Sequence, residues 1–210
     1  MIKRWRAAAI AMSTIGALGL ALGLAVPAQA QFSASYKFLE SVRKKEGDKV
    51  TDALNEPGSQ IVNTRDVSTG QSALHIVTAR RDVTWMQFLV AKGANVNIRD
   101  NKGMTPLVLA CQLGFIEGVD FLISVGARVD EPDNTGETPL IGAVHKRDLA
   151  LVRALLKAGA NPDRPDNSGR SARDYARLDS SETMLNEIET TAKARAAGGG
   201  AKKSYGPAIP

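Results

Sequence analysis

The sequence is poor in the residues that most often carry chemistry. Cys111 is the only cysteine among 210 residues, and His75 and His145 are the only histidines. A single cysteine cannot form an intramolecular disulfide, and two distant histidines lack the spacing of a metal site. No nucleophile elbow, Walker loop, paired-cysteine motif or metalloprotease helix occurs. We therefore expect no enzymatic activity, no metal and no cofactor, and a fold that is stabilised by packing.

An excess of charge of one sign is also missing once the first residues are set aside. The chain has 27 Lys and Arg against 22 Asp and Glu, a net charge of +5. Lys3, Arg4 and Arg6 precede the uncharged run Ala7 to Val26, and without them 24 cations face 22 acids. A chain of nearly balanced charge has no electrostatic signature of nucleic-acid binding, so we expect no nucleic-acid partner.

The first thirty residues have the organisation of a secretory signal peptide. A basic start and an apolar run lead to Ala28-Gln29-Ala30, where small residues occupy the cleavage positions. Trp5 interrupts a twin-arginine pair, and no cysteine follows the apolar run to accept lipid. The pattern predicts export to the periplasm by the general secretory route, with cleavage after Ala30. The alternative is a retained anchor, because about twenty apolar residues can span a bilayer.

The other end of the chain has few apolar residues. Residues 194–210 include Gly198-Gly199-Gly200, Lys202-Lys203 and two prolines. Such a segment cannot bury enough apolar surface to offset the entropy of ordering, so the composition predicts a disordered tail.

Between these ends, residues 33–193 repeat themselves every 33 residues. Several residue types recur at this interval, which indicates a repeat architecture. The recurring positions are Gly70, Gly103, Gly136 and Gly169; Gly93, Gly126 and Gly159, each followed by Ala; Leu74, Leu107 and Leu140; and Leu89, Leu122 and Leu155.

One unit contains the signals of two short helices. Thr105-Pro106 is a helix start, because the hydroxyl can accept from a free backbone N–H and proline at the first position loses no needed donor. An apolar face of Leu107, Ala110 and Cys111 follows, and Gly114 ends this helix. A second helix is expected over 115–124, before a turn rich in Asp, Asn and Gly. Such a unit is too small to have a core of its own.

The repeated motif resembles the ankyrin repeat, whose period is 33 residues. The resemblance rests on Gly103-Met104-Thr105-Pro106-Leu107 and its counterpart Gly136-Glu137-Thr138-Pro139-Leu140, with Gly93-Ala94-Asn95-Val96-Asn97 closing a unit. It implies an all-α solenoid of helix-turn-helix units with β-turn fingers. The implied divisions are an N-terminal cap (33–65), three internal repeats (66–99, 100–132 and 133–165) and a C-terminal cap (166–193).

The sequence departs from the family pattern at three kinds of position. His75 occupies the family's histidine position, where the resemblance implies a hydrogen bond to the neighbouring turn, but Val108 and Ile141 stand at the equivalent sites. Arg81 and Arg147 stand where the second repeat has Gly114, so we expect strained or altered turns there. In the last unit, Arg173 replaces the usual leucine.

Asp100, Asp133 and Asp166 recur at one repeat position and could be mistaken for metal ligands. Each opens a turn, where an Asp side chain bonds to its own backbone, so we interpret all three as turn residues.

By resemblance, the contact residues of the solenoid are those at the turn tips and on the exposed side of each first helix. The resemblance implies a non-catalytic scaffold that binds a protein partner through its concave face. The implied contact residues are Arg80, Arg99, Asn101, Lys102, Met104, Gln112, Leu113, Asn134, Glu137, His145, Lys146 and Arg170, together with Ser68, Thr69, Gln71, Ala79 and Asn167.

Five of these residues are cationic and only Glu137 is acidic, which favours a partner with an acidic patch. The domain is expected to act as a monomer. The alternative is a peripheral binder of an anionic membrane surface, through the basic face and the Lys202-Lys203 tail.

Overall fold

The computed structural model describes residues 28–179 and 181–197. Most of the predicted signal peptide and the tail from residue 198 onward lie outside these residues. Ten α-helices and one 3-10 helix follow one another along the described chain. They are α1 (Ala28–Lys44), α2 (Gly47–Asn55), η1 (Ile61–Asn63), α3 (Ala73–Ala79), α4 (Val83–Ala91), α5 (Pro106–Leu113), α6 (Ile116–Ser124), α7 (Pro139–His145), α8 (Leu149–Ala158), α9 (Ala172–Leu178) and α10 (Glu182–Ala197).

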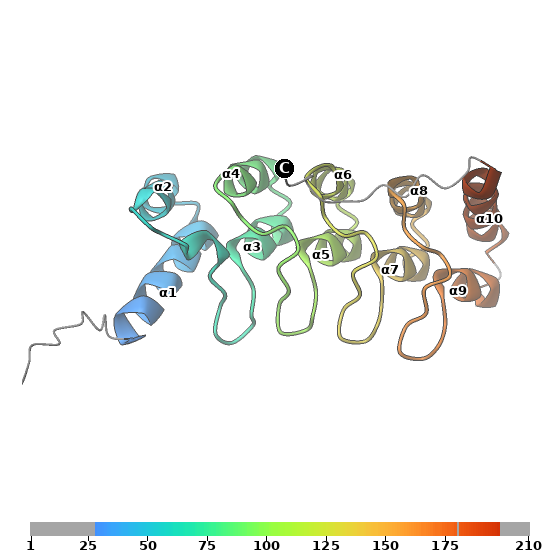
Figure 1. Ribbon diagram of the computed structural model, residues 1–210, viewed down its shortest axis with the longest axis horizontal. Coiled ribbons are helices and arrows are strands. Elements are labelled where there is room, and N and C mark those ends of the chain that lie inside the picture. Colours follow the sequence, from blue (N-terminus) through green and yellow to red (C-terminus); the bar gives the residue numbers. More distant parts are fainter. Residues whose placement is uncertain (1–27, 180, 198–210) are drawn as a thin grey trace, which may run out of the picture.

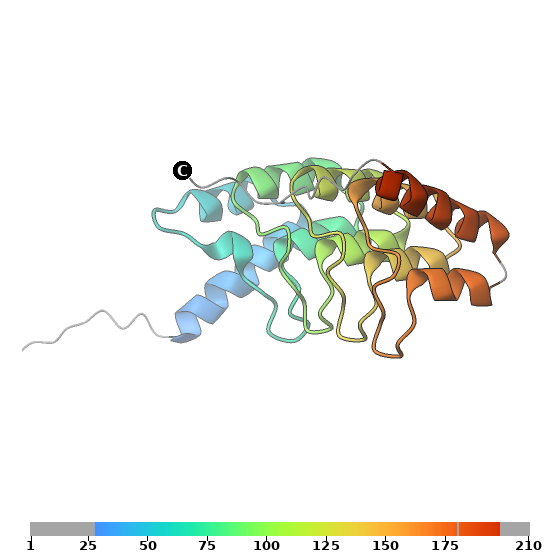
Figure 2. The same ribbon diagram turned by 45° about the vertical axis from the view of Figure 1, so that its right-hand side comes forward.

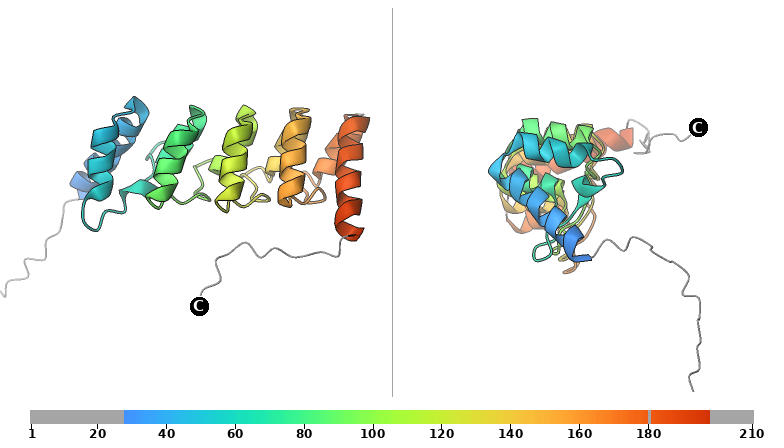
Figure 3. Two further views of the ribbon diagram at one scale, coloured as in Figure 1. Left: turned by 90° about the horizontal axis from the view of Figure 1, so that it is seen from above. Right: turned by 90° about the vertical axis from the view of Figure 1, so that its left-hand side faces the viewer.

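The helices form two stacked rows. The odd-numbered helices make an inner row, the even-numbered helices make an outer row, and extended loops project on the side of the inner row (Figures 1 and 2). The outer helices run side by side in nearly the same direction, as the left view of Figure 3 shows. Within the described chain the only β-bridge joins Arg65 to Ser72 at the base of the first loop. We call these projecting loops fingers. The all-α solenoid with turn-like fingers is confirmed.

The core is a continuous spine shared by all the units. Leu74, Leu107 and Leu140 are fully buried at equivalent places on α3, α5 and α7. Each inner helix packs on the next, so every leucine is covered by a neighbouring unit as well as by its own. Cys111 is buried in the same spine, and burial raises the pKa of its thiol to about 12. Burial that depends on neighbours makes stability a property of the stack.

The inner helices begin as their sequences predict. The hydroxyls of Thr105 and Thr138 accept hydrogen bonds from the backbone N–H groups of Val108 and Ile141, at 3.3 and 3.2 Å. A proline occupies the first turn in both helices. In α9 the start is a capping box, in which Ser171 and Asp174 each accept from the other's backbone N–H. Each of these caps satisfies a backbone N–H group of the first turn that would otherwise have no partner in the helix.

The described domain is longer at both ends than the repeat boundaries imply. Helix α1 begins at Ala28, so it runs through the predicted cleavage position after Ala30. Helix α10 continues to Ala197, four residues beyond the expected end of the C-terminal cap. Of the helices in the described part of the chain, none combines the length and apolar character needed to cross a membrane.

Candidate binding surface

The fingers are joined to one another by a ladder of asparagines. Asn101, Asn134 and Asn167 each donate a backbone hydrogen bond and a side-chain amide hydrogen bond to the preceding finger. The backbone bonds reach the carbonyls of Thr69, Lys102 and Thr135 at 3.0, 3.0 and 3.2 Å, and the amide bonds reach those of Ser68, Asn101 and Asn134 at 3.0, 3.0 and 3.1 Å. The side-chain amides of these predicted contact residues therefore hold the fingers in register.

The ladder explains why glycine recurs at the finger tips. Gly103 has φ of 76°, and a Cβ atom there would lie 2.2 Å from Oδ1 of Asn134 and 2.6 Å from Nη2 of Arg99. The last finger differs, because a Cβ atom at Gly169 would meet nothing within 4 Å. Glycine in the inner fingers is thus required by the backbone angle and by the next asparagine, whereas in the last finger the angle alone requires it.

The repeated aspartates close the turns, as expected. Oδ1 of Asp133 accepts from the backbone N–H groups of Thr135 and Glu137 at 2.8 and 3.0 Å, and Asp100 and Asp166 make the equivalent bonds. The pKa of the Asp166 carboxyl lies well below its usual range, chiefly because Tyr175 donates its hydroxyl hydrogen to it. Nowhere in the described chain do three or more His, Cys, Asp or Glu side chains come together to hold a metal ion.

A second set of cross-links joins the loops that follow the outer helices. Asn97 donates to the carbonyl of Gly126 at 3.3 Å and accepts from the N–H of Arg128 at 2.8 Å. At the next junction Asp130 takes this place, and it accepts from Asn161 at 2.7 Å but has no amide hydrogen to donate. The last unit has no successor, and there Asp163 forms a bidentate pair with Arg173 at 2.7 and 3.2 Å. The departure at Arg173 thus ends this set of cross-links.

His75 is a structural hydrogen-bonding residue, as predicted. Its ring is fully buried, with Nδ1 accepting from the N–H of Ser72 at 3.2 Å and Nε2 lying 3.0 Å from the carbonyl of Met104 in the next finger. Burial lowers the pKa of His75, which favours the neutral ring. Val108 and Ile141 are buried at the equivalent positions, where apolar contact replaces this tie.

Two of the predicted contact cations are used inside the domain. Arg80 donates to the carbonyl of Val42 in α1, pairs with Asp82 at 3.2 Å and lies 4.8 Å from the centre of the Trp85 ring. Arg99 pairs with Glu131 of the next loop at 2.8 Å. Both side chains fasten neighbouring units together, so they contribute less charge to the surface than the sequence implies.

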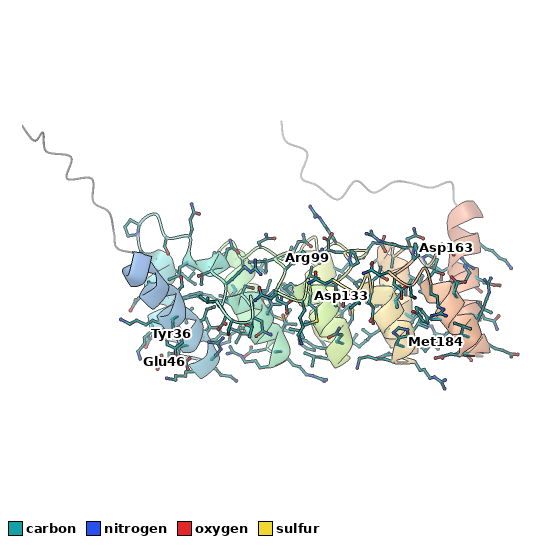
Figure 4. All side chains as sticks on the ribbon, turned by 90° about the horizontal axis from the view of Figure 1, so that it is seen from below. Tyr36, Glu46, Arg99, Asp133, Asp163 and Met184 are labelled. Atoms are coloured by element: carbon teal, nitrogen blue, oxygen red, sulfur yellow. The ribbon has the colours of Figure 1, made fainter. Side chains whose placement is uncertain are left out.

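The remaining predicted contact residues lie at the two ends of the inner helices. Lys102, Met104, Glu137 and Arg170 belong to the fingers, and Gln112, Leu113, His145 and Lys146 end the inner helices. Figure 4 shows these two edges, with Arg99, at the base of a finger, on one side and Glu46, at a turn between an inner and an outer helix, on the other. We call them the finger edge and the corner edge.

One contact joins the residues on either side of helix α7. The Nδ1 atom of His145, at the end of α7, lies 3.5 Å from Oε1 of Glu137, which follows the third finger. The His145 ring also packs edge-on against Tyr175, with centroids 4.3 Å apart.

The corner edge contains residues that the contact prediction missed. The expected altered turns are confirmed, since Arg81 and Arg147 have φ of 57° and 56°, and Lys45 shares this conformation with φ of 59°. Each follows another basic residue and precedes an acid, in the triplets Lys44-Lys45-Glu46, Arg80-Arg81-Asp82 and Lys146-Arg147-Asp148. This dibasic-acidic triplet between two helices is the sequence signal that could have revealed them.

Stacked helical pairs that share one core and are joined through fingers define a repeat solenoid, a class of protein that offers an extended surface to other molecules. Residues 40–133 match the family model described as ankyrin repeats in three copies, and residues 135–167 match that of a single ankyrin repeat. The chain therefore belongs to the ankyrin repeat family. Most of the expected N-terminal cap falls within the first matched span. Ankyrin repeats are generally protein–protein interaction modules.

Proposed function

We propose that this domain is a non-catalytic scaffold that binds a protein partner on the surface between its finger edge and its corner edge. The observation that carries the proposal is the contrast between a fixed backbone and free side chains. The asparagine ladder fixes the fingers, while Lys102, Lys146 and Arg170 remain exposed and have no ion pair among the described residues. Because the backbone is already ordered, binding does not add the entropic cost of ordering the fingers to the cost of ordering these side chains.

The centre of this surface offers apolar contact. Met104, Gln112 and Leu113 are half-buried, and they lie in the second repeat between Lys102 and Lys146. Binding energy commonly concentrates in a few central residues surrounded by polar ones. A partner with an apolar contact residue and acidic neighbours would complement this arrangement.

We further propose that the scaffold acts in the periplasm after export. The support comes from the basic start, the apolar run and the small residues at Ala28 and Ala30. Intact-mass measurement of the protein from a periplasmic extract tests this proposal, with a mass that starts at Gln31 as the expected result. A full-length mass in the membrane fraction would contradict it and favour the retained anchor.

Photo-crosslinking in intact cells tests the binding surface. A photoreactive residue at Gln112 should capture a protein partner, and the same residue at Gln87, exposed on outer helix α4, is the matched control. Equal capture at both positions would place binding elsewhere. Purified domain mixed with phosphatidylglycerol vesicles tests the membrane alternative, which predicts salt-sensitive sedimentation with vesicles and no crosslinked protein.

Charge reversal then tests the acidic patch. Lys102→Glu with Arg170→Glu should lower capture several-fold, whereas Lys157→Glu with Lys193→Glu changes the net charge equally on the outer helices α8 and α10. Unchanged capture by the first pair would remove the acidic-patch proposal. Reversal at Arg80 or Arg99 would not separate binding from stability, because both residues hold units together.

A further inference from the structure

The turns between inner and outer helices form a row of basic corners along the corner edge. Lys44 and Lys45 lie in the first corner, Arg81 in the second, and Lys146 and Arg147 in the fourth. All five side chains are exposed, with 62% of the Lys45 side chain and 66% of the Arg147 side chain accessible. The corners thus present cations to solvent at repeated positions.

The acids that follow these cations are occupied by contacts within the domain. Asp82 accepts from the N–H of Trp85 at 3.1 Å, and Asp148 accepts from Ala150 and Leu151 at 3.1 Å, so both cap outer helices. Glu46 accepts from Ser41 at 2.9 Å and from Lys49 at 3.0 Å. These carboxylates keep their charge, and their hydrogen bonds hold them at the starts of the outer helices, while the cations beside them extend into solvent.

Four of the five corner cations make contacts that leave them open to a ligand, whereas Arg81 donates a hydrogen bond within the domain. Lys45 lies 3.9 Å from Asp82, Lys44 lies 3.7 Å from Glu40, and Arg147 lies 3.4 Å from Asp179. These are long, exposed pairs of the kind that contributes little stability. Within the described residues, Lys146 has no ion pair at all.

The third corner interrupts the row with apolar surface. Leu113, Gly114 and Phe115 take the place of a basic triplet there, and Gly114 has the same left-handed conformation, with φ of 63°. Leu113 is half-buried, and its carbonyl accepts from Arg81 of the preceding corner. Along the row the order is therefore basic, basic, apolar, basic.

This order and its spacing point to one kind of ligand. Neighbouring packed helices lie about 10 Å apart, and an extended chain advances about 3.3 Å per residue, so one corner corresponds to about three residues of peptide. We propose that the corner edge binds an extended acidic segment of the partner protein, with carboxylates at the basic corners and one apolar side chain over Leu113. This proposal rests on the proposed function, because it assumes a protein partner.

The test uses a synthetic peptide as the probe. The matching peptide has ten residues, with glutamate at its first, fourth and tenth positions, leucine at its seventh and glycine elsewhere, a register of about three residues per corner. The register control has the same composition with leucine moved to the first position. Fluorescence anisotropy with the purified domain should show tighter binding of the matching peptide, and equal binding of the two would overturn the proposed register.

Two matched double variants locate the peptide. Lys44→Glu with Lys146→Glu should weaken binding about tenfold, which corresponds to roughly 1.4 kcal/mol. Lys102→Glu with Arg170→Glu changes the net charge equally on the finger edge and should have less than about a twofold effect. Circular dichroism confirms that both variants fold. Equal weakening by the two pairs would overturn the corner edge as the site.

Two further measurements separate this inference from its alternatives. Leu113→Ser should abolish the preference for the matching peptide, and a preference that survives would overturn the role of Leu113. If the corner variant loses sedimentation with phosphatidylglycerol vesicles but still binds the peptide, the corners recognise lipid and the proposal is wrong. If the peptide fails to bind while Gln112 still captures a protein in cells, the proposed function stands without this inference.

Discussion

The finger edge and the corner edge of the solenoid use polar residues in opposite ways. On the finger edge, Asn101, Asn134 and Asn167 bind the backbone of the preceding unit, so their side-chain amides are occupied. On the corner edge, Lys44, Lys45 and Lys146 contribute side chains that remain exposed. The asparagines of the finger edge fix the geometry of the stack, whereas these three lysines of the corner edge carry charge on a frame that is already fixed.

The contrast separates substitutions that affect stability from those that affect binding. A polar residue that completes a backbone hydrogen bond between units is coupled to the stack, because its loss leaves a carbonyl unpaired. A cation at an exposed turn makes weak contacts, so its replacement costs little stability. Changes on the finger edge should therefore lower the free energy of unfolding more than changes on the corner edge.

The largest effect is expected from Gly103→Ala. The new methyl group forces alanine into a left-handed conformation and displaces Asn134, so the free energy of unfolding should fall by about 3 kcal/mol. Gly169→Ala introduces the same conformation in the last finger without the collision, and it should cost about 1 kcal/mol. Urea denaturation measures both, and equal losses would show that the ladder does not depend on this glycine.

A somewhat smaller effect is expected from His75→Val, which copies the residue at Val108. It removes the bonds to Ser72 and Met104 and should cost about 2 kcal/mol at pH 7.5. The difference in stability between the wild type and this variant should also depend on pH. Because burial lowers the pKa of His75, the unfolded chain takes up a proton first as the pH falls. Wild-type stability should therefore decrease below about pH 6.5, and the decrease should be shallower in the variant. If the stability of the two proteins changes equally with pH, the assignment of His75 as a buried neutral ring is wrong.

Removing the side-chain amide of one asparagine in the ladder should have a moderate effect on stability. Asn134→Ala deletes the amide bond to the carbonyl of Asn101 but keeps the backbone bond to Lys102, so a loss of about 1 kcal/mol is expected. Asn186→Ala, at an exposed position of α10, is the control and should change stability by less than about 0.5 kcal/mol. A neutral Asn134 variant would show that the backbone bonds alone hold the fingers.

The smallest effect is expected on the corner edge. Arg147→Gly loses the exposed pair with Asp179 but relieves the left-handed conformation of a non-glycine residue. These effects oppose each other, so the free energy of unfolding should change by less than about 1 kcal/mol. Differential scanning calorimetry checks this, and a large drop in Tm would mean that the corners stabilise the stack as the fingers do.

Features that depend on local chemistry could be predicted from the sequence. The starts of α5 and α7 follow from Thr-Pro pairs, and the left-handed turns at Arg81 and Arg147 follow from their alignment with Gly114. The hydrogen bond from His75 to the neighbouring finger likewise follows from its place in a motif of known period.

Features that depend on a partner one repeat away could not be assigned in this way. An asparagine at a turn tip has the same sequence pattern whether it faces solvent or, like Asn134, bonds to a carbonyl 33 residues earlier. Arg80 and Arg99 resemble surface cations, and only the three-dimensional arrangement shows that Val42 and Glu131 are their partners. The free contact surface is therefore smaller than the sequence suggests.

The asymmetry of the Asn97 and Asp130 cross-links has a mechanical consequence. Between the second and third repeats Asp130 donates no amide hydrogen, and Gly114 has no side chain with which to reach the next corner. Packing of α5 on α7 and the two Asn134 bonds to the second finger hold this junction together with the single Asp130 bond. On this side of the stack, the second and third repeats are therefore joined by one hydrogen bond fewer than the first and second repeats.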